Sequence, residues 1–386
     1  MKKILLGTTT LIGAAALFSG AALADGPKVT LGGVADFQAG FLSDDNDADQ
    51  RSGAFRSDTE VTLDIKGVAD NGLTYGGHIM LETDVEGANS GHDSDNQGFN
   101  AGRTYLFVEG SWGRLQGGSD LGVTKTMKVD ASNIARATGG IDGDFRYWGL
   151  ATTGPGTLLA TPDLILDHGP ATIAIGANER DENLNKLSYY TPRFSGFQAG
   201  ISYLFDTAAG SRGQVVALGD NTAGQAEGVI LGAVNWEGKF DQIGINVGAT
   251  GEWGDSESTT TEDLQTWQAG AMLTYMGFSV AGSYGDWGDS LLAVATNDDE
   301  RHFWTAGVAY ETGPFGASIT YLKSETELTA TTENEFDNIS VGVDYKLAPG
   351  FTPYAEVSFF EVDEAGTGLL NDNDGSVFIL GSQLAF

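Results

Sequence analysis

Side chains suited to covalent or metal chemistry are few and scattered in this sequence. There is no cysteine, which excludes thiolate metal sites and cysteine nucleophiles. No histidine stands in a His-Glu-x-x-His pattern, and no Gly-x-Ser-x-Gly, Walker loop or dinucleotide fingerprint is present. The four histidines are His78, His92, His168 and His302. We therefore predict that the protein is not an enzyme and has no metal site or cofactor built from these residue types.

Charged residues are abundant, and most are acidic. The 386 residues include 20 Lys and Arg against 53 Asp and Glu, a formal net charge of −33. Nucleic-acid binding needs a basic surface, so we expect no nucleic-acid partner. Extreme acidity can indicate disorder, but 41% hydrophobic and 10% aromatic residues argue against disorder of the whole chain. The excess acid must therefore contact water in a folded protein that is also rich in apolar residues.

Basic residues gather in one part of the chain. Nine of the 18 Lys and Arg beyond position 24 fall between positions 51 and 146. Acids and bases that face each other across a water-filled gap create a field that orders water and favours polar over apolar solutes. For any single residue, an ordinary pair between neighbouring charges is an equally good interpretation. The residues that we predict to line such a gap are Asp142, Asp144 and Asp130 on one side and Arg56, Lys66, Arg103 and Arg114 on the other.

One acidic stretch resembles the start of a calcium-binding loop. It contains Asp44, Asp45, Asp47 and Asp49, but Gln50 replaces the required glycine and Arg56 stands where the closing glutamate belongs. The EF-hand interpretation therefore fails. Loosely bound Ca²⁺ at acidic loops is the one cofactor expectation that the sequence leaves open.

The first residues have the features of a targeting signal. Lys2 and Lys3 precede an apolar or small stretch from Ile4 to Phe18, and Ala22-Leu23-Ala24 is a small-x-small cleavage site. We predict a signal peptide over residues 1–24 and a mature chain over 25–386, with 18 Lys and Arg, 53 Asp and Glu and a net charge of −35. A retained helical anchor is the alternative, but the apolar stretch is too short to span a bilayer.

The dominant period along the chain is two residues. Between Val29 and Phe41, apolar or small residues at odd positions alternate with mostly polar or small residues at even ones. The same alternation recurs at 58–66, 73–82, 242–250 and 338–347. It indicates long strands with one apolar and one hydrophilic face. A charged face along the whole of a long strand is typical of a wall that lines water.

Connections between these strands alternate between short and long. Ala69-Asp70-Asn71-Gly72 and Gly110-Ser111-Trp112-Gly113 are tight turns, whereas Ser43–Arg56, Val85–Asn100 and Ser324–Glu335 are long and polar. This asymmetry is the signature of a transmembrane barrel. We predict an all-β, 16-stranded antiparallel transmembrane β-barrel with strands at about 28–41, 58–68, 73–84, 103–109, 114–119, 184–191, 197–205, 228–236, 242–253, 264–275, 278–284, 301–310, 315–323, 336–347, 351–360 and 376–386.

The longest stretch without alternation runs from about 120 to 183. A barrel of 16 strands leaves an aqueous channel, and a loop folded into it would set its width. We therefore predict that this stretch is an inward-folded constriction loop. A loop that stands outside the barrel is the alternative.

Two segments are similar to general diffusion porins of alphaproteobacteria. Residues Leu187–Tyr203, with Thr191-Pro192-Arg193-Phe194-Ser195-Gly196 at the turn, resemble the strand-turn-strand that follows the constriction loop in that family. Residues Arg103–Asp120 resemble the hairpin before it, and the terminal Phe386 resembles the recognition signal of outer-membrane assembly. The resemblance implies a homotrimer in the outer membrane of a Gram-negative bacterium, in contact with lipid and lipopolysaccharide, with wall bases facing the loop.

These observations together predict a water-filled channel for passive diffusion of small hydrophilic solutes and ions, with a cation preference caused by acidic outer loops. A substrate-selective channel for sugars or phosphate is the first alternative, and it would need an aromatic slide or a denser basic cluster. A secreted soluble β-rich binding protein is the second. An outer-membrane hydrolase is the third, although its nucleophile motif is missing.

Overall fold

The computed structural model of the chain describes residues 26–45, 52–82, 100–149, 160–168, 184–207, 223–294, 300–329, 332–364 and 373–386. The predicted signal peptide at 1–24 lies outside these residues. Within the described ranges, no helix is both long and apolar enough to cross a bilayer.

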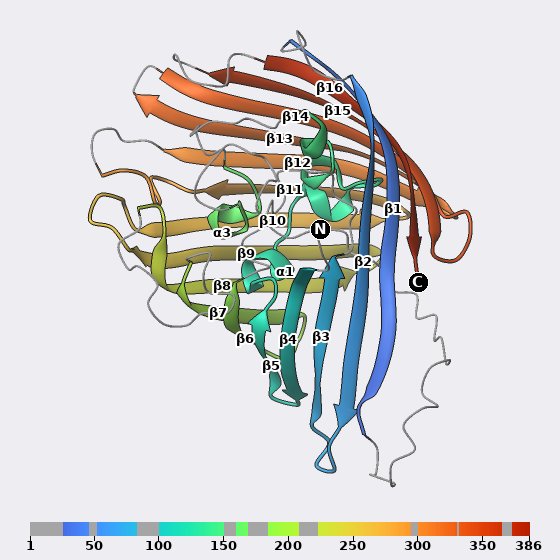
Figure 1. Cartoon of the computed structure of the whole chain (residues 1–386), viewed down its shortest axis with the longest axis vertical. Helices are drawn as coiled ribbons and strands as arrows, with labels where there is room; N and C mark the ends of the chain where they lie inside the picture. Colours follow the sequence, from blue (N-terminus) through green and yellow to red (C-terminus); the bar gives the residue numbers. More distant parts are fainter. Residues whose placement is uncertain are drawn as a thin grey trace.

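Sixteen antiparallel strands form one closed barrel, in which each strand pairs with its neighbours in sequence and β1 pairs with β16 (Figure 1). This confirms the predicted fold class. The strands are β1 Lys28–Asp44, β2 Gly53–Val68, β3 Thr74–Glu82, β4 Asn100–Gly110, β5 Gly113–Ser119, β6 Asn185–Tyr190, β7 Phe197–Asp206, β8 Ala226–Phe240, β9 Ile243–Ser256, β10 Leu264–Tyr275, β11 Phe278–Asp286, β12 Arg301–Thr312, β13 Phe315–Thr329, β14 Thr332–Tyr345, β15 Phe351–Glu364 and β16 Asn373–Ala385.

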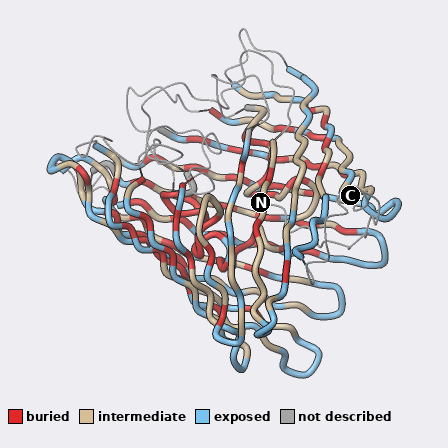
Figure 2. Tube along the Cα trace, turned by 60° about the horizontal axis from the view of Figure 1, so that its bottom comes forward, coloured by how far each residue is buried: buried red, intermediate tan, exposed pale blue. Residues whose placement is uncertain are grey.

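The apolar face of the strands points outward. In β1, Phe37 is 55% exposed, whereas its neighbours Asp36 and Gln38 are 3% and 0% exposed. Buried and exposed positions alternate in this way along many strands (Figure 2). Ring pairs such as Trp304 with Tyr321 and Phe278 with Tyr310 lie on the outer face near opposite ends of the barrel. An apolar outside between two aromatic rows is what a lipid-facing wall requires.

The two ends of the barrel differ in their connections. We call the end with tight turns the short-turn end; it includes Ala69–Leu73, closed by a 2.8 Å backbone hydrogen bond, and the pair Met276 and Gly277. Both residues of that pair have positive φ, 47° and 86°, which a two-residue hairpin turn between twisted strands needs. We call the opposite end the long-loop end.

Two sequence interpretations need correction. The polar stretch Ser324–Glu335, predicted as a long loop, is mostly paired strand in β13 and β14, because its residues pair up to Thr329 and Thr332, with one register shift between Glu327 and Thr329. In β4, the alternation between an apolar and a hydrophilic face does not hold, because apolar residues occur on both faces. The register places Tyr105 and Phe107 on the same side as His78 and Gly76, which is the inner side.

The stretch after β5 folds into the barrel. It contains α1 Val123–Met127, η2 Ala131–Ile134, η3 Gly140–Asp142, α2 Arg146–Gly149 and α3 Leu164–His168. From α1 to η3 it contacts successive strands from β7 to β14, α2 contacts β1, and α3 contacts β10. In Figure 1 this cyan and green stretch lies within the ring of strands. We call its described residues, 120–149 and 160–168, the inward segment. The predicted inward fold is therefore confirmed.

Candidate pore constriction

The inward segment is held against the wall by hydrogen bonds to its backbone. The Glu356 carboxylate on β15 accepts from the backbone N–H groups of Thr138 and Gly140 at 3.3 and 3.2 Å and from the Thr138 hydroxyl. On β13, Ser318 Oγ accepts from the Arg136 N–H at 2.8 Å and Thr320 Oγ1 accepts from the Ile141 N–H at 3.2 Å. Irregular backbone cannot satisfy its own polar groups, so wall side chains must do so. These contacts fix where the segment can sit.

Glycine on the wall allows this close approach. A Cβ at Gly270 of β10 would lie 1.8 Å from the Val129 carbonyl oxygen of the segment. No real Cβ tolerates such a distance, so any other residue here would push the segment toward the lumen. The high glycine content of the chain, 56 residues, thus has a specific use on the inner wall.

The principal contacts of the inward segment leave part of the inner wall facing the lumen. Within the described residues, its main strand contacts are with β1 and with β7 to β14, and it is also hydrogen-bonded to Glu356 of β15 and to Lys186 of β6. The inner side of β2 to β5 therefore faces the segment across the channel, and we call it the open wall. The charges that meet between the segment and this wall are the candidates for a constriction.

Asp144 and Arg56 are the predicted acid and base that the fold brings together. Arg56 Nη1 on β2 lies 3.7 Å from Asp144 Oδ2, and its Nη2 lies 3.3 Å from Asp58. Gln38 of β1 also donates to Asp144, and the Arg56 guanidinium stacks 4.1 Å from the centre of the Tyr147 ring. This group links the segment to the edge of the open wall.

Asp142 points instead into a cluster of charges within the segment itself. Its carboxylate lies 2.9 Å from Arg146 Nη1, 3.8 Å from Lys125 Nζ and 3.7 Å from Lys128 Nζ. Both lysines also pair with Asp163, just before α3. We call Lys125, Lys128, Asp142, Arg146 and Asp163 the ionic cluster. It joins two parts of the segment that are far apart in sequence.

Electrostatics stabilise the charged forms in this cluster. Burial alone would raise the pKa of the Asp142 carboxyl, but Lys125, Lys128 and Arg146 hold that pKa well below its ordinary value. Burial would lower the pKa of the Lys128 ammonium, but Asp130 and Asp163 raise it above its ordinary value. The Asp142 carboxylate and the Lys128 ammonium therefore stay charged at neutral pH.

Asp130 has a structural contact as well as a charge. Its carboxylate accepts from the Ser132 N–H at 2.6 Å, and Asn133 accepts from the Asp130 N–H at 3.0 Å, so that the two residues form a capping box for η2. Lys128 Nζ lies 3.2 Å from the same carboxylate. Asp130 was predicted to contribute a negative charge to the channel lining, and it also stabilises the η2 turn of the inward segment.

The other three predicted bases lie apart from Arg56. Lys66 is ten residues further along β2, about 33 Å at the rise of a strand. Arg114 is the second residue of β5, beside the tight turn, where it lies 4.0 Å from Glu109 and stacks on Phe107 at 4.1 Å. Arg103 on β4 lowers the pKa of Asp120, which burial raises by a larger amount. Lys66 and Arg114 therefore belong to the short-turn end, whereas Arg103 lies near the start of the inward segment.

Sequence reasoning missed Lys125, Lys128, Arg146 and Asp163. Lys125 and Lys128 are three residues apart, but the acids that neutralise them lie up to 38 residues further along an irregular stretch. The sequence did contain a signal for these pairs, because acids and bases are nearly equal in number in this stretch. Counting both signs, and not the acids alone, would have predicted internal pairing.

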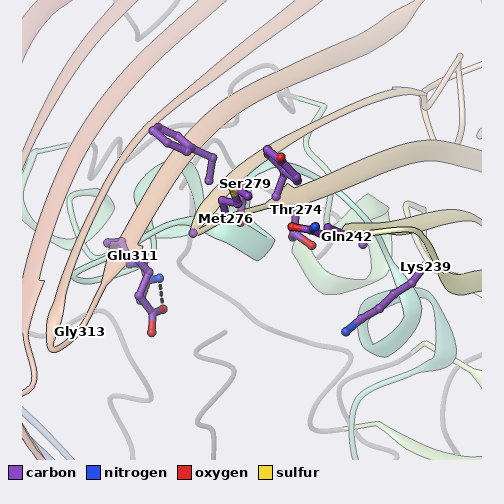
Figure 3. Close-up of a pocket in the computed structure, with 12 residues that line it drawn as sticks. Lys239, Gln242, Thr274, Met276, Ser279, Glu311 and Gly313 are labelled. Atoms are coloured by element: carbon purple, nitrogen blue, oxygen red, sulfur yellow. Dashed lines mark hydrogen bonds and ion pairs between the residues drawn. The ribbon is translucent and has the colours of Figure 1, made fainter.

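A cavity of about 410 Å³ lies at the short-turn end (Figure 3). Lys239 and Glu311 extend from different sides of it, and Thr274, Ser279 and Gln242 contribute neutral polar groups. Arg136 of the inward segment reaches Glu311, which also accepts from Lys346 at 2.9 Å. The segment is thus tied to the short-turn end of the wall as well as to its middle.

The described residues contain no group of three or more His, Asp or Glu that could hold a metal ion. Asp47 and Asp49 of the calcium-like stretch lie outside the described ranges.

Comparison with known proteins places this architecture in a family. A family model described as Gram-negative porin matches residues 8–365. Outer membrane porin protein 32 of Delftia acidovorans is 32% identical over 209 residues, 53% of this chain and 50% of that protein, so the match spans about half the length of this relative.

Solved porin structures share the fold. An anion-selective porin from Comamonas acidovorans superposes with a TM-score of 0.65 at 19% identity, covering 93% of this chain and all of that one. OmpT of Vibrio cholerae, in its trimer form, superposes with a TM-score of 0.60 at 12% identity, covering 94% and 100%. With the closed 16-stranded wall and its outward apolar face, these matches lead to one conclusion: the chain belongs to the Gram-negative porin family and is an outer-membrane channel protein.

Proposed function

We propose that this porin is a general diffusion channel for small hydrophilic solutes and ions, whose narrowest part lies between the inward segment and the open wall. The observation that carries the proposal is the attachment of the inward segment inside the barrel, by Glu356, Ser318 and Thr320. A segment fixed in this way narrows a channel without closing it. The Asp144–Arg56 pair lies where segment and wall meet and contributes charges of both signs.

The proposed ion preference is for cations and arises mainly at the long-loop end. The inward segment contributes little, with six acids against four bases over its described residues. The strand ends at 43–45, 300–303, 323–337, 361–364 and 373–376 contain twelve acids and two bases. Such a rim raises the local cation concentration at the mouth. The anion-selective porin named above shares the fold at 19% identity, a level at which charge placement differs freely.

The assembly that we propose is a homotrimer embedded in outer-membrane lipid and lipopolysaccharide. A trimeric form is known for the Vibrio cholerae protein that shares the fold. On the outer face of β1, β2 and β16, Phe37 stacks on Phe55 and Phe41 on Phe378, with ring centroids 5.5 and 6.4 Å apart. This aromatic surface suits either a subunit contact or the lipid boundary.

Planar-bilayer conductance tests the proposal. Purified protein should open water-filled channels in groups of three, and a salt gradient should give a reversal potential of cationic sign. The preference should fall from 0.1 M to 1 M salt, because the Debye length falls from about 10 to about 3 Å and screens the rim. Absence of conductance would contradict the channel proposal, and an anionic reversal potential would contradict the rim argument.

A further inference from the structure

One row of residues crosses the inner face of the barrel near the short-turn end, over the strands β1 to β4 that lie side by side in Figure 1. Lys28 shares the inner face of β1 with the buried Asp36, and Lys66 shares the inner face of β2 with Arg56. We call this row the base–ring row. The register places its members opposite one another in the order Lys28, Lys66, Gly76 and Phe107.

Two lysines begin the base–ring row and stand directly opposite each other. Opposed residues on neighbouring strands have Cβ atoms about 5 Å apart, and like charges in such positions are destabilising. Lys28 and Lys66 are both exposed, and neither forms an ion pair with a described residue. A carboxylate has two oxygens and can accept from both ammonium groups, which would remove the repulsion between them.

An aromatic ring ends the base–ring row, on a wall that is otherwise polar where it lines water. Phe107 is half-buried, and its ring lies over the neighbouring strand, because a Cβ at Gly76 would be 2.9 Å from two of the ring atoms. Glycine at position 76 thus leaves room for the ring and puts no side chain between it and Lys66. The part of the ring that remains exposed faces the lumen, where a solute can cover it.

The guanidinium of Arg114 extends this aromatic surface onto β5. It lies 4.1 Å from the centre of the Phe107 ring and 5.8 Å from the centre of the Tyr105 ring, and the side chain keeps 31% of its surface exposed. A planar guanidinium stacks on aromatic faces and attracts anions at the same time. The end of the row therefore combines a ring surface with a positive charge.

Charge decides between ligand classes. The bases in and beside the row are the two opposed lysines and Arg114. The acids beside them have other partners, because Glu109 lies 4.0 Å from Arg114 and Asp64 is hydrogen-bonded to His78 at 2.8 Å. Neither acid forms an ion pair with either lysine. The row therefore attracts anions and repels cations.

The spacing along the row limits the ligand further. The Cα atoms of Lys66 and Phe107 are two strand spacings apart, about 10 Å, with only a glycine between them. We infer that the base–ring row is a weak binding site for aromatic monocarboxylates, of which benzoate is the simplest, with the carboxylate at the lysines and the ring at Phe107 and Arg114. This inference rests on the proposed diffusion function, because the solute reaches the row through the channel. The acidic rim lies at the opposite end of the barrel, so the two features act on ions separately.

The test is benzoate binding to the purified full-length protein, measured in two ways. In planar bilayers, benzoate should reduce the open current with a saturating concentration dependence. Acetate has the charge without the ring and benzamide has the ring without the charge, so neither should saturate over the same range. In detergent, a ligand-observed NMR titration should give the same order of affinity without any reliance on conductance.

Matched variants locate the site. Lys66→Gln should weaken benzoate binding by roughly 1.4- to 5-fold, the effect of one exposed ion pair. Phe107→Leu keeps an apolar side chain and removes the ring, so binding should weaken by roughly two- to tenfold. Lys239→Gln and Phe278→Leu repeat these substitutions at exposed positions of the short-turn end outside the row, and both should leave benzoate binding unchanged.

The outcomes distinguish this inference from the proposed function. Conducting channels with no saturating benzoate effect and no binding by NMR would overturn the site and leave the diffusion channel intact. Equal block by acetate, or equal weakening by Lys239→Gln and Lys66→Gln, would show general attraction of anions and would also overturn it. Benzoate binding in detergent by a protein that never conducts would support the site and overturn the proposed channel.

Discussion

Asp142 and Asp144 lie two residues apart in the inward segment but have different electrostatic roles. Asp142 is surrounded by Lys125, Lys128 and Arg146 of the same segment, whereas Asp144 pairs with Arg56 on the wall. The first interaction holds the segment together and the second connects it to the barrel. The field in the channel therefore depends on which charges pair, and not on how many acids a loop contains.

Removing a charge from the ionic cluster should have the largest effect. Asp142→Asn leaves two lysines and an arginine that face fewer acids in a buried site, and breaking a buried ion pair costs about 3–5 kcal/mol. We expect a less stable inward segment, seen as a lower thermal unfolding temperature of the purified protein and as irregular single-channel currents. Asp144→Asn is the matched variant and should leave the unfolding temperature nearly unchanged. Equal destabilisation by both changes would contradict the division of roles.

The wall attachment at Glu356 should rank second. Glu356→Ala removes the acceptor for the Thr138 and Gly140 N–H groups and for the Thr138 hydroxyl, and each donor left unsatisfied costs about 1–3 kcal/mol. We expect higher open-channel noise and a larger mean conductance, measured in planar bilayers. Glu356→Gln keeps a carbonyl acceptor, so its open-channel noise should be close to that of the unaltered protein. If the alanine variant conducts like the unaltered protein, other contacts must hold the segment.

Much of the barrel could be predicted from the sequence. A strand with two different faces produces a two-residue period in the sequence, and this period can be recognised without knowledge of the tertiary structure. The number of strands and the inward course of the described residues 120–149 and 160–168 followed from that period and from its interruption. The end of β13 and the start of β14 could not be predicted in this way, because residues such as Glu325 and Glu335 look like loop residues until their pairing partners are known.

The candidate constriction was less predictable, because the contacts of its residues are also set by tertiary structure. Arg56 and Asp144 could be named by residue type, but their contact depends on how an irregular segment crosses the barrel. The partners of Asp142 lie on short helical turns whose orientation is set by wall contacts such as Glu356, which no local pattern encodes. Lys66 lies on the predicted inner face of its strand, but near the short-turn end and far from Arg56. The alternation of residues indicates the face of a strand and not the position along the barrel axis.

The Asp144–Arg56 contact should have a smaller, purely electrostatic effect. Both side chains keep some exposure to water, and a partly exposed pair is worth about 0.2–1 kcal/mol. Asp144→Asn should therefore shift the cation-to-anion permeability ratio toward anions by roughly 1.4- to 5-fold, because the Arg56 charge is less compensated. Reversal potentials in a KCl gradient measure this ratio. A shift toward cations would show that Asp144 does not act through Arg56.

The pH dependence should give the smallest effect and should separate Asp142 from a third carboxyl, Asp120. Because the pKa of Asp142 is held below its ordinary value, its pairing contributes stability that is present above about pH 4, the titration range of an unfolded aspartate, and is lost only as the pH falls through the lower folded value. Burial raises the pKa of Asp120, so this carboxyl takes up a proton at a higher pH than an exposed aspartate. Acidification toward pH 4 should therefore neutralise Asp120 first, beside Arg103, and shift the permeability ratio slightly toward anions while the ionic cluster stays intact. Asp120→Asn should remove this shift; an unfolding temperature that falls over the same pH range would instead show that the cluster around Asp142 titrates there.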